Sequence, residues 1–385
     1  MSQLSVGVCG SSRKENEFRL PIHPRHFEAI PLELRQSMFL EDGYGRRFGT
    51  KPEQLTGLFA GVRTQSQLFE ECDVILLPKP LAEDLDEMHE GQILWGWPHC
   101  VQDERLTQSA IDRKLTLIAW EAMNVWHSDG SFNLHVFQKS NELAGYCSVL
   151  HALQMLGLTG QYGRQLRAAV ISFGSTARGA VTALAALGIP DVTILSHRDP
   201  AQVASPVSSA TILQFESEAN GSSRLNVITD EGSRPMVDVL SEHDIVVNCV
   251  LQDPDTPQVF VVNDDLDRFA PGGLFIDVSC DEGMGFEWAR PTAFSDPMFT
   301  VGDVVHYYAV DHSPSYLWNS ATWQISEAVL SYLPTVIAGP QAWDADDTVR
   351  RAIEIRNGVV QNPKIVPFQR RSPDYPHVRL TSPTQ

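Results

Sequence analysis

The chain has 385 residues and an ordinary globular composition, with 43% hydrophobic and 20% charged residues. This length suits two domains, each with a core of its own. The formal net charge of −19 argues against nucleic acid or an anionic membrane surface as a main partner, because both attract basic surfaces. No run of 18 apolar residues is present, so we expect no transmembrane helix.

The N-terminus and the cysteines both favour a cytoplasmic protein. The opening MSQLSVGVCGSSRKENEF becomes charged at Arg13 and has no long apolar stretch, so it does not resemble a secretory signal. No C-x-x-C pair is present, which predicts reduced, mostly buried thiols and neither a disulfide framework nor a metal site. The six cysteines are Cys9, Cys72, Cys100, Cys147, Cys249 and Cys280.

The first third of the chain alternates apolar runs with helical patterns. Runs of buried-strand length cover residues 4–9 (LSVGVC), 72–80 (CDVILLPKP) and 114–120 (KLTLIAW). A helical pattern over 52–71 lies between two of them. This alternation is the β-α-β rhythm of a parallel sheet.

A second β-α-β series follows a helical pattern over 140–157. Its expected strands cover 167–173, 191–197, 243–250, 272–279 and 304–312. Helix is expected again over 312–340, and the amphipathic part at 323–337 should pack back on the first domain. The tail after about Gly358 lacks periodicity, so we expect it to be irregular and exposed, most clearly over 369–385.

The stretch AAVISFGSTARGAVTALAALG (168–188) predicts a strand that turns sharply into a helix. Such a turn binds a dinucleotide when backbone N–H groups approach the pyrophosphate at the helix N-terminus. In this interpretation Gly174 makes the turn, Gly179 allows close packing of helix and strand, and Thr176 replaces the usual middle glycine. The bare motif is weak evidence, because many strand–helix turns carry glycines at such spacing.

The end of the next strand, ILSHRDP, indicates which cofactor the turn would bind. NAD-binding folds usually place Asp or Glu there, to bind the ribose 2′-hydroxyl. Here Ser196, His197 and Arg198 stand instead. A hydroxyl and a guanidinium suit a 2′-phosphate, which a carboxylate would repel. We therefore expect NADP(H) rather than NAD(H), with an ordinary exposed loop arginine as the alternative.

Several stretches together resemble the alanine dehydrogenase/pyridine nucleotide transhydrogenase family. KENEFRLPIHP (14–24) is similar to the family's K-x-x-E-x-R pattern, and DVILLPKP (73–80) to the strand that ends in its substrate lysine. WGWPH (95–99) is similar to the segment with the catalytic histidine, and ELAGYCSVLHAL (142–153) to the helix that enters the cofactor domain. The block 276–299 resembles the family's D-x-A-x-D-x-G-G…R-P-T block.

Further stretches favour the N5-(carboxyethyl)ornithine synthase branch of this family, among them GSTARGA (174–180) and HYYAVDHSPSYLWNSA (306–321). The chain also departs from the Asn-Met-Pro-Gly of alanine dehydrogenases at 311–314. The resemblance implies NADPH-dependent reductive condensation of a pyruvate-like 2-oxo acid with the amino group of an ornithine- or lysine-like amino acid. An alanine dehydrogenase that uses ammonia and a non-catalytic NADP(H)-binding relative remain alternatives.

The resemblance also implies roles for single residues. Lys79 would hold or polarise the oxo acid, Arg19 would clamp its carboxylate, and His99 would exchange protons. Asp281 would relay protons or orient the amine, and Asp311 would contact the amine-bearing substrate. Without the resemblance, Arg19 is interpreted as a surface charge or structural ion pair, His99 as a core histidine and Asp281 as a helix N-cap. Cofactor contacts are expected at Asn141, Gly174, Ser175, Thr176, Ala177, Arg178, Gly179, Ser196, His197, Arg198, Val250 and Leu251.

These observations together predict an α/β fold with two Rossmann-like domains built on parallel sheets, the cofactor domain inserted into the substrate domain. The substrate and catalytic domain is expected over 1–141 and 312–385, and the NADP(H)-binding domain over 142–311. The expected partners are small-molecule substrates, with no nucleic acid and no membrane. The resemblance implies a homo-oligomer.

Overall fold

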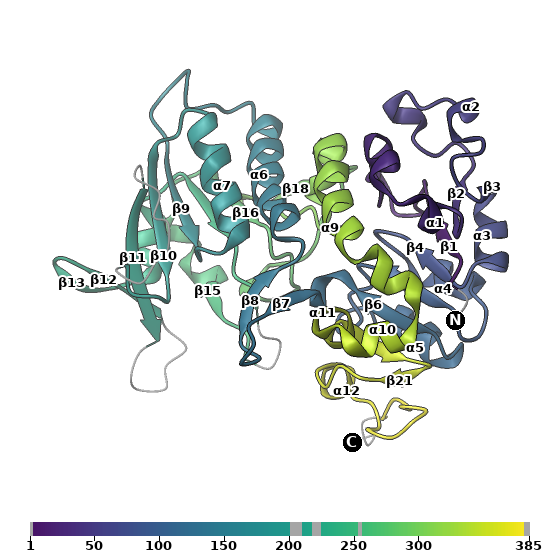
Figure 1. The fold of residues 1–385 in the computed structure, drawn as a ribbon. Coiled ribbons are helices and arrows are strands. Elements are labelled where there is room, and N and C mark those ends of the chain that lie inside the picture. The colour runs from purple at the N-terminus through teal and green to yellow at the C-terminus, as the bar shows by residue number, and fades with distance from the viewer. Residues whose placement is uncertain (1–2, 201–209, 218–224, 253–255, 381–385) are drawn as a thin grey trace. The chain divides into compact units, whose positions relative to one another are not determined.

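The chain divides into two compact units, one of them inserted into the other along the sequence (Figure 1). The computed structural model describes residues 3–200, 210–217, 225–252 and 256–380. One unit comprises Met1–Gln138 with Leu317–Gln385, and the other comprises Lys139–Tyr316. The assignment of the first to substrate and of the second to cofactor remains a prediction.

The first unit is built on an eight-stranded sheet whose central strands are parallel. Two short strands from the C-terminal part, β20 and β21, add to the β6 edge, where β20 runs antiparallel to β6. The sheet order is β21 (Val359–Val360), β20 (Ile353–Arg356), β6 (Thr116–Ala119), β5 (Ile93–Gly96), β4 (Val74–Leu76), β1 (Val6–Val8), β2 (Met38–Glu41), β3 (Gly61–Arg63). A separate hairpin joins β7 (Asn124–Trp126) to β8 (Phe132–His135).

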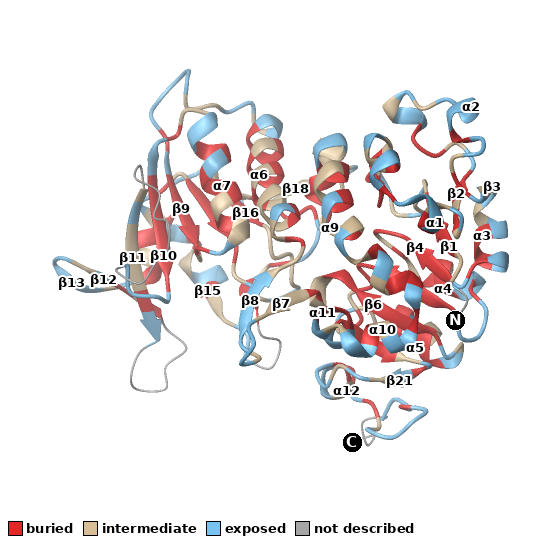
Figure 2. Ribbon diagram, viewed as in Figure 1, coloured by how far each residue is buried: buried red, intermediate tan, exposed pale blue. Residues whose placement is uncertain are grey.

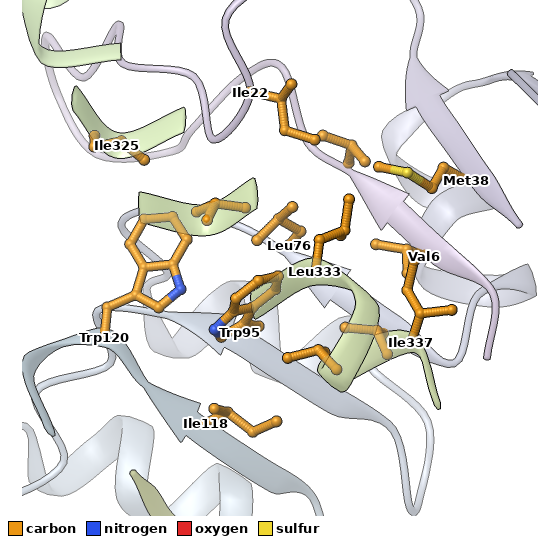
Figure 3. Packing of buried hydrophobic residues seen from close by; sticks show 14 of the residues in the cluster. Val6, Ile22, Met38, Leu76, Trp95, Ile118, Trp120, Ile325, Leu333 and Ile337 are labelled. Atoms are coloured by element: carbon orange, nitrogen blue, oxygen red, sulfur yellow. The ribbon is translucent and has the colours of Figure 1, made fainter. Parts of the chain in front are cut away.

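Helices cover both faces of this sheet. The long helix α9 (Trp318–Ala338) packs on one face, where Leu333 and Ile337 lie against Val6 and Trp95 (Figure 3). The prediction that 323–337 packs back on the first domain is therefore confirmed. The other face is covered by α3 (Gln65–Glu71), α4 (Ala82–Glu87) and α5 (Glu104–Asp112). Shorter helices are α1 (Leu32–Arg35), α2 (Pro52–Leu55), α10 (Pro340–Ala345), α11 (Asp347–Arg351) and α12 (Ile365–Phe368).

The helical interpretation of 52–71 is wrong, because this segment contains a strand. Strand β3 separates α2 from α3 and pairs in parallel with β2. Thr64 then caps α3, its hydroxyl accepting a hydrogen bond from the backbone N–H of Gln67. An N-cap residue has extended backbone, so helix α3 cannot continue back through Thr64.

The prediction of an irregular, exposed tail is wrong for β21 and α12 but holds for most of 369–380, which contains no helix or strand beyond one isolated bridge. The tail forms β21 and α12 and then folds back on the unit. Arg371 is only 2% exposed and donates hydrogen bonds to Gln369, Gln108 and the carbonyl of His377. A buried guanidinium needs such acceptors, so these contacts anchor the segment. Residues 381–385 of the same prediction lie outside the described residues.

The second unit is built on a nine-stranded sheet with a parallel centre and antiparallel edges. Figure 2 shows its central strands buried between helices. All five predicted strands are confirmed, as β9, β10, β14, β16 and β19; the sequence missed β11, β12, β13 and β18. The order is β13 (Gly232–Pro235), β12 (Leu225–Thr229), β11 (Ala210–Ser217), β10 (Asp191–Ser196), β9 (Arg167–Ile171), β14 (Ile245–Asn248), β16 (Gly273–Asp277), β19 (Val305–Tyr308), β18 (Met298–Val301).

Two helices of this unit, α6 (Gln138–Met155) and α7 (Ser175–Ala186), approach each other closely through glycines. A Cβ on Gly179 would lie 1.7 Å from the carbonyl oxygen of Glu142, and one on Gly145 would lie 1.9 Å from that of Thr176. Gly179 therefore allows helix–helix packing rather than the helix–strand packing expected from the sequence. The remaining elements are α8 (Met236–Ser241) and the pair β15 (Val259–Val261) and β17 (Gly285–Phe286).

All six cysteines are free thiols, and five of them are buried. Within the described ranges, no helix is long and apolar enough to cross a membrane.

Candidate functional site

Two predicted catalytic side chains, Lys79 and His99, contact each other in the first unit. Lys79 follows β4 and His99 follows β5, the neighbouring parallel strand. Lys79 Nζ lies 2.9 Å from His99 Nε2. An ammonium group can only donate, so His99 Nε2 accepts this hydrogen bond and the imidazole proton sits on Nδ1. The carboxyl ends of parallel strands are the usual place for a site in an open α/β sheet.

Backbone contacts hold the two loops at this spacing. The N–H of Trp97 donates to the carbonyl of Pro78 at 3.0 Å. A Cβ on Gly96 would lie 1.9 Å from the carbonyl oxygen of Leu77, so glycine is required for the loops to approach this closely. His99 itself has a left-handed backbone, with φ 49°. The backbone of the two loops therefore holds Lys79 and His99 close enough for their side chains to touch.

Glu121, a carboxylate that we did not single out from the sequence, lies next to His99. Its Oε1 accepts a hydrogen bond from the backbone N–H of His99 at 2.6 Å and lies 3.8 Å from Nδ1 of the His99 imidazole. Burial and the nearby charge of Glu354 raise the pKa of Glu121, while Lys79 opposes this rise. Glu121 follows β6, so its place just beyond a buried strand was the signal that could have found it.

Arg19 is buried and ion-paired within its own segment. It is 6% exposed, and its guanidinium donates from Nε and Nη2 to the two carboxylate oxygens of Glu17. Its Cζ lies 5.3 Å from the ring centroid of Trp97, in the loop that carries His99. The structure thus contains the structural ion pair that was the alternative for Arg19, and it excludes a surface charge. The carboxylate clamp remains a prediction.

The turn after β9, in the second unit, has a different register from our sequence interpretation. Ser172 has the left-handed backbone, with φ 84°, whereas Gly174 is extended, with φ −84° and ψ −168°. Gly174 caps helix α7, and a Cβ there would enter open space. Ala177 is fully buried. Ser172, Gly174 and Ala177 thus occupy the three positions of G-x-G-x-x-G/A, and Thr176 is an ordinary helix residue.

A cavity of about 260 Å³ opens beside this turn. It brings together six of the predicted cofactor residues: Gly174, Arg178, Ser196, His197, Arg198 and Val250. Its other lining residues are Ser172, Phe173 and Phe215, so none of the described residues that line it carries a carboxylate. The other six do not line this cavity: Ser175, Thr176, Ala177 and Gly179 lie in α7, Asn141 lies in α6, and Leu251 is 96% exposed.

Two guanidinium groups and a hydroxyl give this cavity its polar character. Arg178 lies with its Cζ 4.3 Å from the ring centroid of Phe173, and Ser196 Oγ accepts a hydrogen bond from the N–H of Arg198. The open space before the N-terminus of α7 and the two cations fit the phosphates of a dinucleotide.

Asp281 follows β16 in the second unit. Burial raises its pKa to about 6, which lets the carboxyl exchange protons near neutral pH. No helix begins there, so the N-cap alternative is wrong. The loop before it is held by Asp277, whose carboxylate accepts hydrogen bonds from the Tyr307 hydroxyl and from the N–H groups of Ser279 and Cys280. Burial raises the pKa of Asp277 to about 7.

Asp311, the predicted contact for the amine-bearing substrate, pairs with its neighbour. Its Oδ1 lies 2.6 Å from Nδ1 of His312, a buried residue. Asp281 and Asp311 belong to the second unit, whereas Arg19, Lys79 and His99 belong to the first.

Each unit carries a parallel-centred sheet, and the second has a dinucleotide-type turn that opens a helix; these features define a two-domain, Rossmann-like α/β protein. The chain belongs to the alanine dehydrogenase/PNT family, whose N-terminal domain matches residues 9–144 and whose C-terminal domain matches 164–363. It is therefore an oxidoreductase of a family that binds a nicotinamide nucleotide. The predicted family and fold class are confirmed.

Relatives with two different activities resemble the chain. It is 24% identical to N(5)-(carboxyethyl)ornithine synthase of Clostridium botulinum, over 81% of this chain and 89% of the relative. It is 28% identical to alanine dehydrogenase of Staphylococcus haemolyticus, over 83% of each. These similarities do not separate the two activities.

Solved structures share the fold. L-alanine dehydrogenase matches with a TM-score of 0.72 and 20% identity, covering 95% of this chain and 99% of that one. The transhydrogenase from Sinorhizobium meliloti matches with a TM-score of 0.65 and 20% identity, covering 93% and 99%.

Proposed function

We propose that this protein condenses a 2-oxo acid with the amino group of an amino acid and reduces the product with NADPH, giving an N-(carboxyalkyl)amino acid. The pyruvate-like and ornithine- or lysine-like substrates follow the synthase branch that the sequence resembles. The observation that carries the proposal is the Lys79–His99 contact, 2.9 Å between Nζ and Nε2. It pairs a fixed cation with a proton-exchanging imidazole, and forming and protonating an imine requires both.

In this proposal the first unit binds the oxo acid. The Lys79 ammonium donates to the substrate carbonyl and withdraws electron density from it, while His99 Nε2 exchanges the proton. Arg19 binds the substrate carboxylate through guanidinium donors beyond the two that Glu17 accepts. Glu121, facing Nδ1 of His99, stabilises the imidazole tautomer that carries its proton on Nδ1 and accepts at Nε2. Water exclusion protects the imine.

The second unit binds the cofactor in this proposal, and bound NADPH supplies the hydride. Gly174 leaves room for the pyrophosphate, which would accept hydrogen bonds from the N-terminal N–H groups of α7. Arg178 and Arg198 would hold the 2′-phosphate, and these two cations in the lining favour NADPH over NADH. Asp281, with a pKa of about 6, serves as a second proton-exchanging group.

Product analysis tests the reaction. Pyruvate or 2-oxoglutarate is incubated with NADPH and, in separate reactions, with ammonium, ornithine, lysine or a panel of other amino acids, and products are identified by mass spectrometry. We expect a secondary amine whose mass joins the oxo acid and an amino acid. A product only with ammonium would contradict the condensation, and NADPH binding without turnover on any amine would indicate a non-catalytic relative.

Alanine dehydrogenase activity is the second candidate. The 28% identity to the Staphylococcus haemolyticus enzyme supports it. It predicts alanine as the product from pyruvate and ammonium, so the ammonium reaction separates the two candidates directly. A homo-oligomer, as the resemblance implies, is checked by light scattering of the purified protein.

A further inference from the structure

A second glutamate with a raised pKa, Glu354, lies in the C-terminal part of the chain. Glu354 is 5% exposed and lies in β20, the strand added antiparallel to β6. Its Oε1 accepts a hydrogen bond from the side-chain amide of Asn362 at 2.9 Å. Among the described residues no N–H or O–H group donates to its buried Oε2, and the thiol of Cys100 is the other group that hydrogen-bonds to this carboxyl. Glu121 likewise keeps one buried carboxylate oxygen, Oε2, without a partner. An ionised oxygen in this state is costly.

The backbone of β20 explains why the side chain of Glu354 is buried here. The pairing of β20 with β6 changes register between Ile353 and Ile355, so Glu354 lies at a β-bulge. Ile353 packs in the core under α9, whereas Ile355 packs in the core on the other side of the sheet. A regular strand would send both to the same face. Bulges re-aim side chains and are frequent beside active sites.

The charges around the two glutamates do not balance if both carboxyl groups are ionised. Lys79 is the cation that acts on Glu121, and His99 accepts a hydrogen bond from Lys79 and is neutral in that arrangement. His135 Nε2 lies 3.1 Å from the backbone carbonyl of Glu121, and its Nδ1 accepts a hydrogen bond from the backbone N–H of Phe137. Glu354 is faced by two neutral groups, the amide of Asn362 and the thiol of Cys100.

Burial raises the pKa of both carboxyl groups, and the charge of Glu354 raises that of Glu121 further. The side chain of Glu121 is 24% exposed, and the like charge of Glu354 disfavours the state in which both carboxyl groups are ionised. One proton on the pair leaves a single negative charge to balance Lys79.

We propose that Glu121 and Glu354 together hold a single proton, so that Glu354 sets the charge that Glu121 presents to His99. Glu354 is then a positioning residue: it touches no reacting atom and acts through Glu121. The inference concerns the residues of the proposed active site. It does not require a particular amine or cofactor, because its tests use the protein without substrate.

The first test uses the unaltered protein, labelled with ¹³C at the glutamate side-chain carboxyl. Carbon NMR at pH 7 should show one glutamate carboxyl equivalent still protonated, because exposed glutamates ionise near pH 4.3. Labelling glutamate alone keeps Asp277 and Asp281 out of the spectrum. If every glutamate carboxyl is ionised at pH 7, the proposal is wrong, whatever the reaction proves to be.

The second test follows His99 by ¹⁵N NMR of histidine-labelled protein, with His99→Asn to assign its signal. Glu354→Gln keeps the acceptor for Asn362 but removes the shared proton, so Glu121 becomes more fully ionised. The titration midpoint of His99 should rise by roughly half to one pH unit. Asp344→Asn is the matched control, because it removes the surface partner of Arg356 on the same strand, 2.8 Å away, without touching the pair.

The outcomes of the second test separate a charge effect from a structural one. A rise in Glu354→Gln but not in Asp344→Asn supports the proposal. Equal midpoints in Glu354→Gln and wild type, with unchanged circular dichroism, overturn it. If Glu354→Gln does not fold, the carboxyl count of the unaltered protein decides alone. Failure of the condensation reaction would leave both measurements intact, so the two proposals fail independently.

Discussion

The corner around Lys79 in the first unit contains Lys79, His99 and Glu121. Its physical properties are opposite to those of the cavity beside Gly174 in the second unit. Around Lys79 the titratable groups are close together, and buried carboxyl groups have raised pKa values. The cavity beside Gly174 is lined by two cations, the exposed Arg198 and the half-buried Arg178, and the helix cap has open space in front of it. Proton exchange gains from burial that moves pKa values toward neutrality, whereas binding phosphate requires access and positive charge.

The largest expected effect tests the chemical role of the first region. Lys79→Ala and His99→Ala should each lower turnover by about 10²–10⁴-fold, the usual contribution of one acid–base group. Cofactor binding, measured by NADPH fluorescence titration, should stay within error of wild type, because neither residue lines the cavity beside Gly174. Near wild-type turnover in either variant would contradict the assignment.

The next effect tests the charge of the second region. Arg198→Ala should raise the Kd for NADPH about tenfold or more, since a charge-assisted hydrogen bond contributes about 1.5–3 kcal/mol. The Kd for NADH should not change, because NADH has no 2′-phosphate. Arg164→Ala is the matched control: Arg164 pairs with Asp244 and does not line the cavity. Equal losses of affinity for NADPH and NADH would show that Arg198 does not bind the 2′-phosphate.

Two glycine variants, one at the N-cap of α7 and one inside it, distinguish an effect on helix packing from an effect on cofactor binding. Gly179→Ala should destabilise the protein by about 1–3 kcal/mol, because its Cβ would overlap the Glu142 carbonyl and force α6 and α7 apart. Gly174→Ala should leave stability nearly unchanged but weaken NADPH binding, since its methyl group would enter the open space before α7. Urea unfolding and fluorescence titration of both variants check this. Clear destabilisation by Gly174→Ala would instead favour the register expected from the sequence, in which Gly174 makes the turn.

Sequence patterns predicted those parts of the molecule in which a local rule decides the structure. The strand before Ser172 and helix α7 follow from apolar periodicity, and both are confirmed. The register of the turn between them could not be derived, because Ser172 adopts the left-handed conformation that we assigned by default to glycine. Strand β3 was missed for a similar reason: three residues between two helical patterns carry too little periodicity.

The site residues divide in the same way. Lys79 and His99 were predicted because their segments resemble the family. The structure places their side chains in contact, whereas their catalytic roles remain predictions. Glu354 was out of reach, because it lies at a bulge in a short strand for which the sequence analysis made no prediction. Only the pairing of β20 with β6 brings it near Glu121, and such long-range pairing leaves no local signal in the sequence.

The smallest expected effect concerns stability at Asp281, the residue of the second unit whose chemistry most resembles the corner around Lys79. Its pKa rises from 3.8 to about 6 on folding because burial penalises the ionised form. The folded state therefore binds this proton more tightly than the unfolded state, and the group lowers stability as pH rises from about 4 to 6. Asp281→Asn removes that penalty.

At pH 8 we expect the free energy of unfolding of Asp281→Asn, measured by urea denaturation, to exceed that of wild type by about 1–2 kcal/mol after allowing for residual exposure. At pH 4 the two proteins should have the same free energy of unfolding. Asp296→Asn, in an exposed turn, is the control and should show no such pH dependence. Turnover should fall in Asp281→Asn, because the neutral amide cannot exchange a proton. A gain in stability together with a loss of turnover would mark Asp281 as a carboxyl retained for chemistry at a cost to the fold. If stability falls at pH 8 instead, the buried carboxylate stabilises the loop, and the proton-exchange role of Asp281 loses its physical basis.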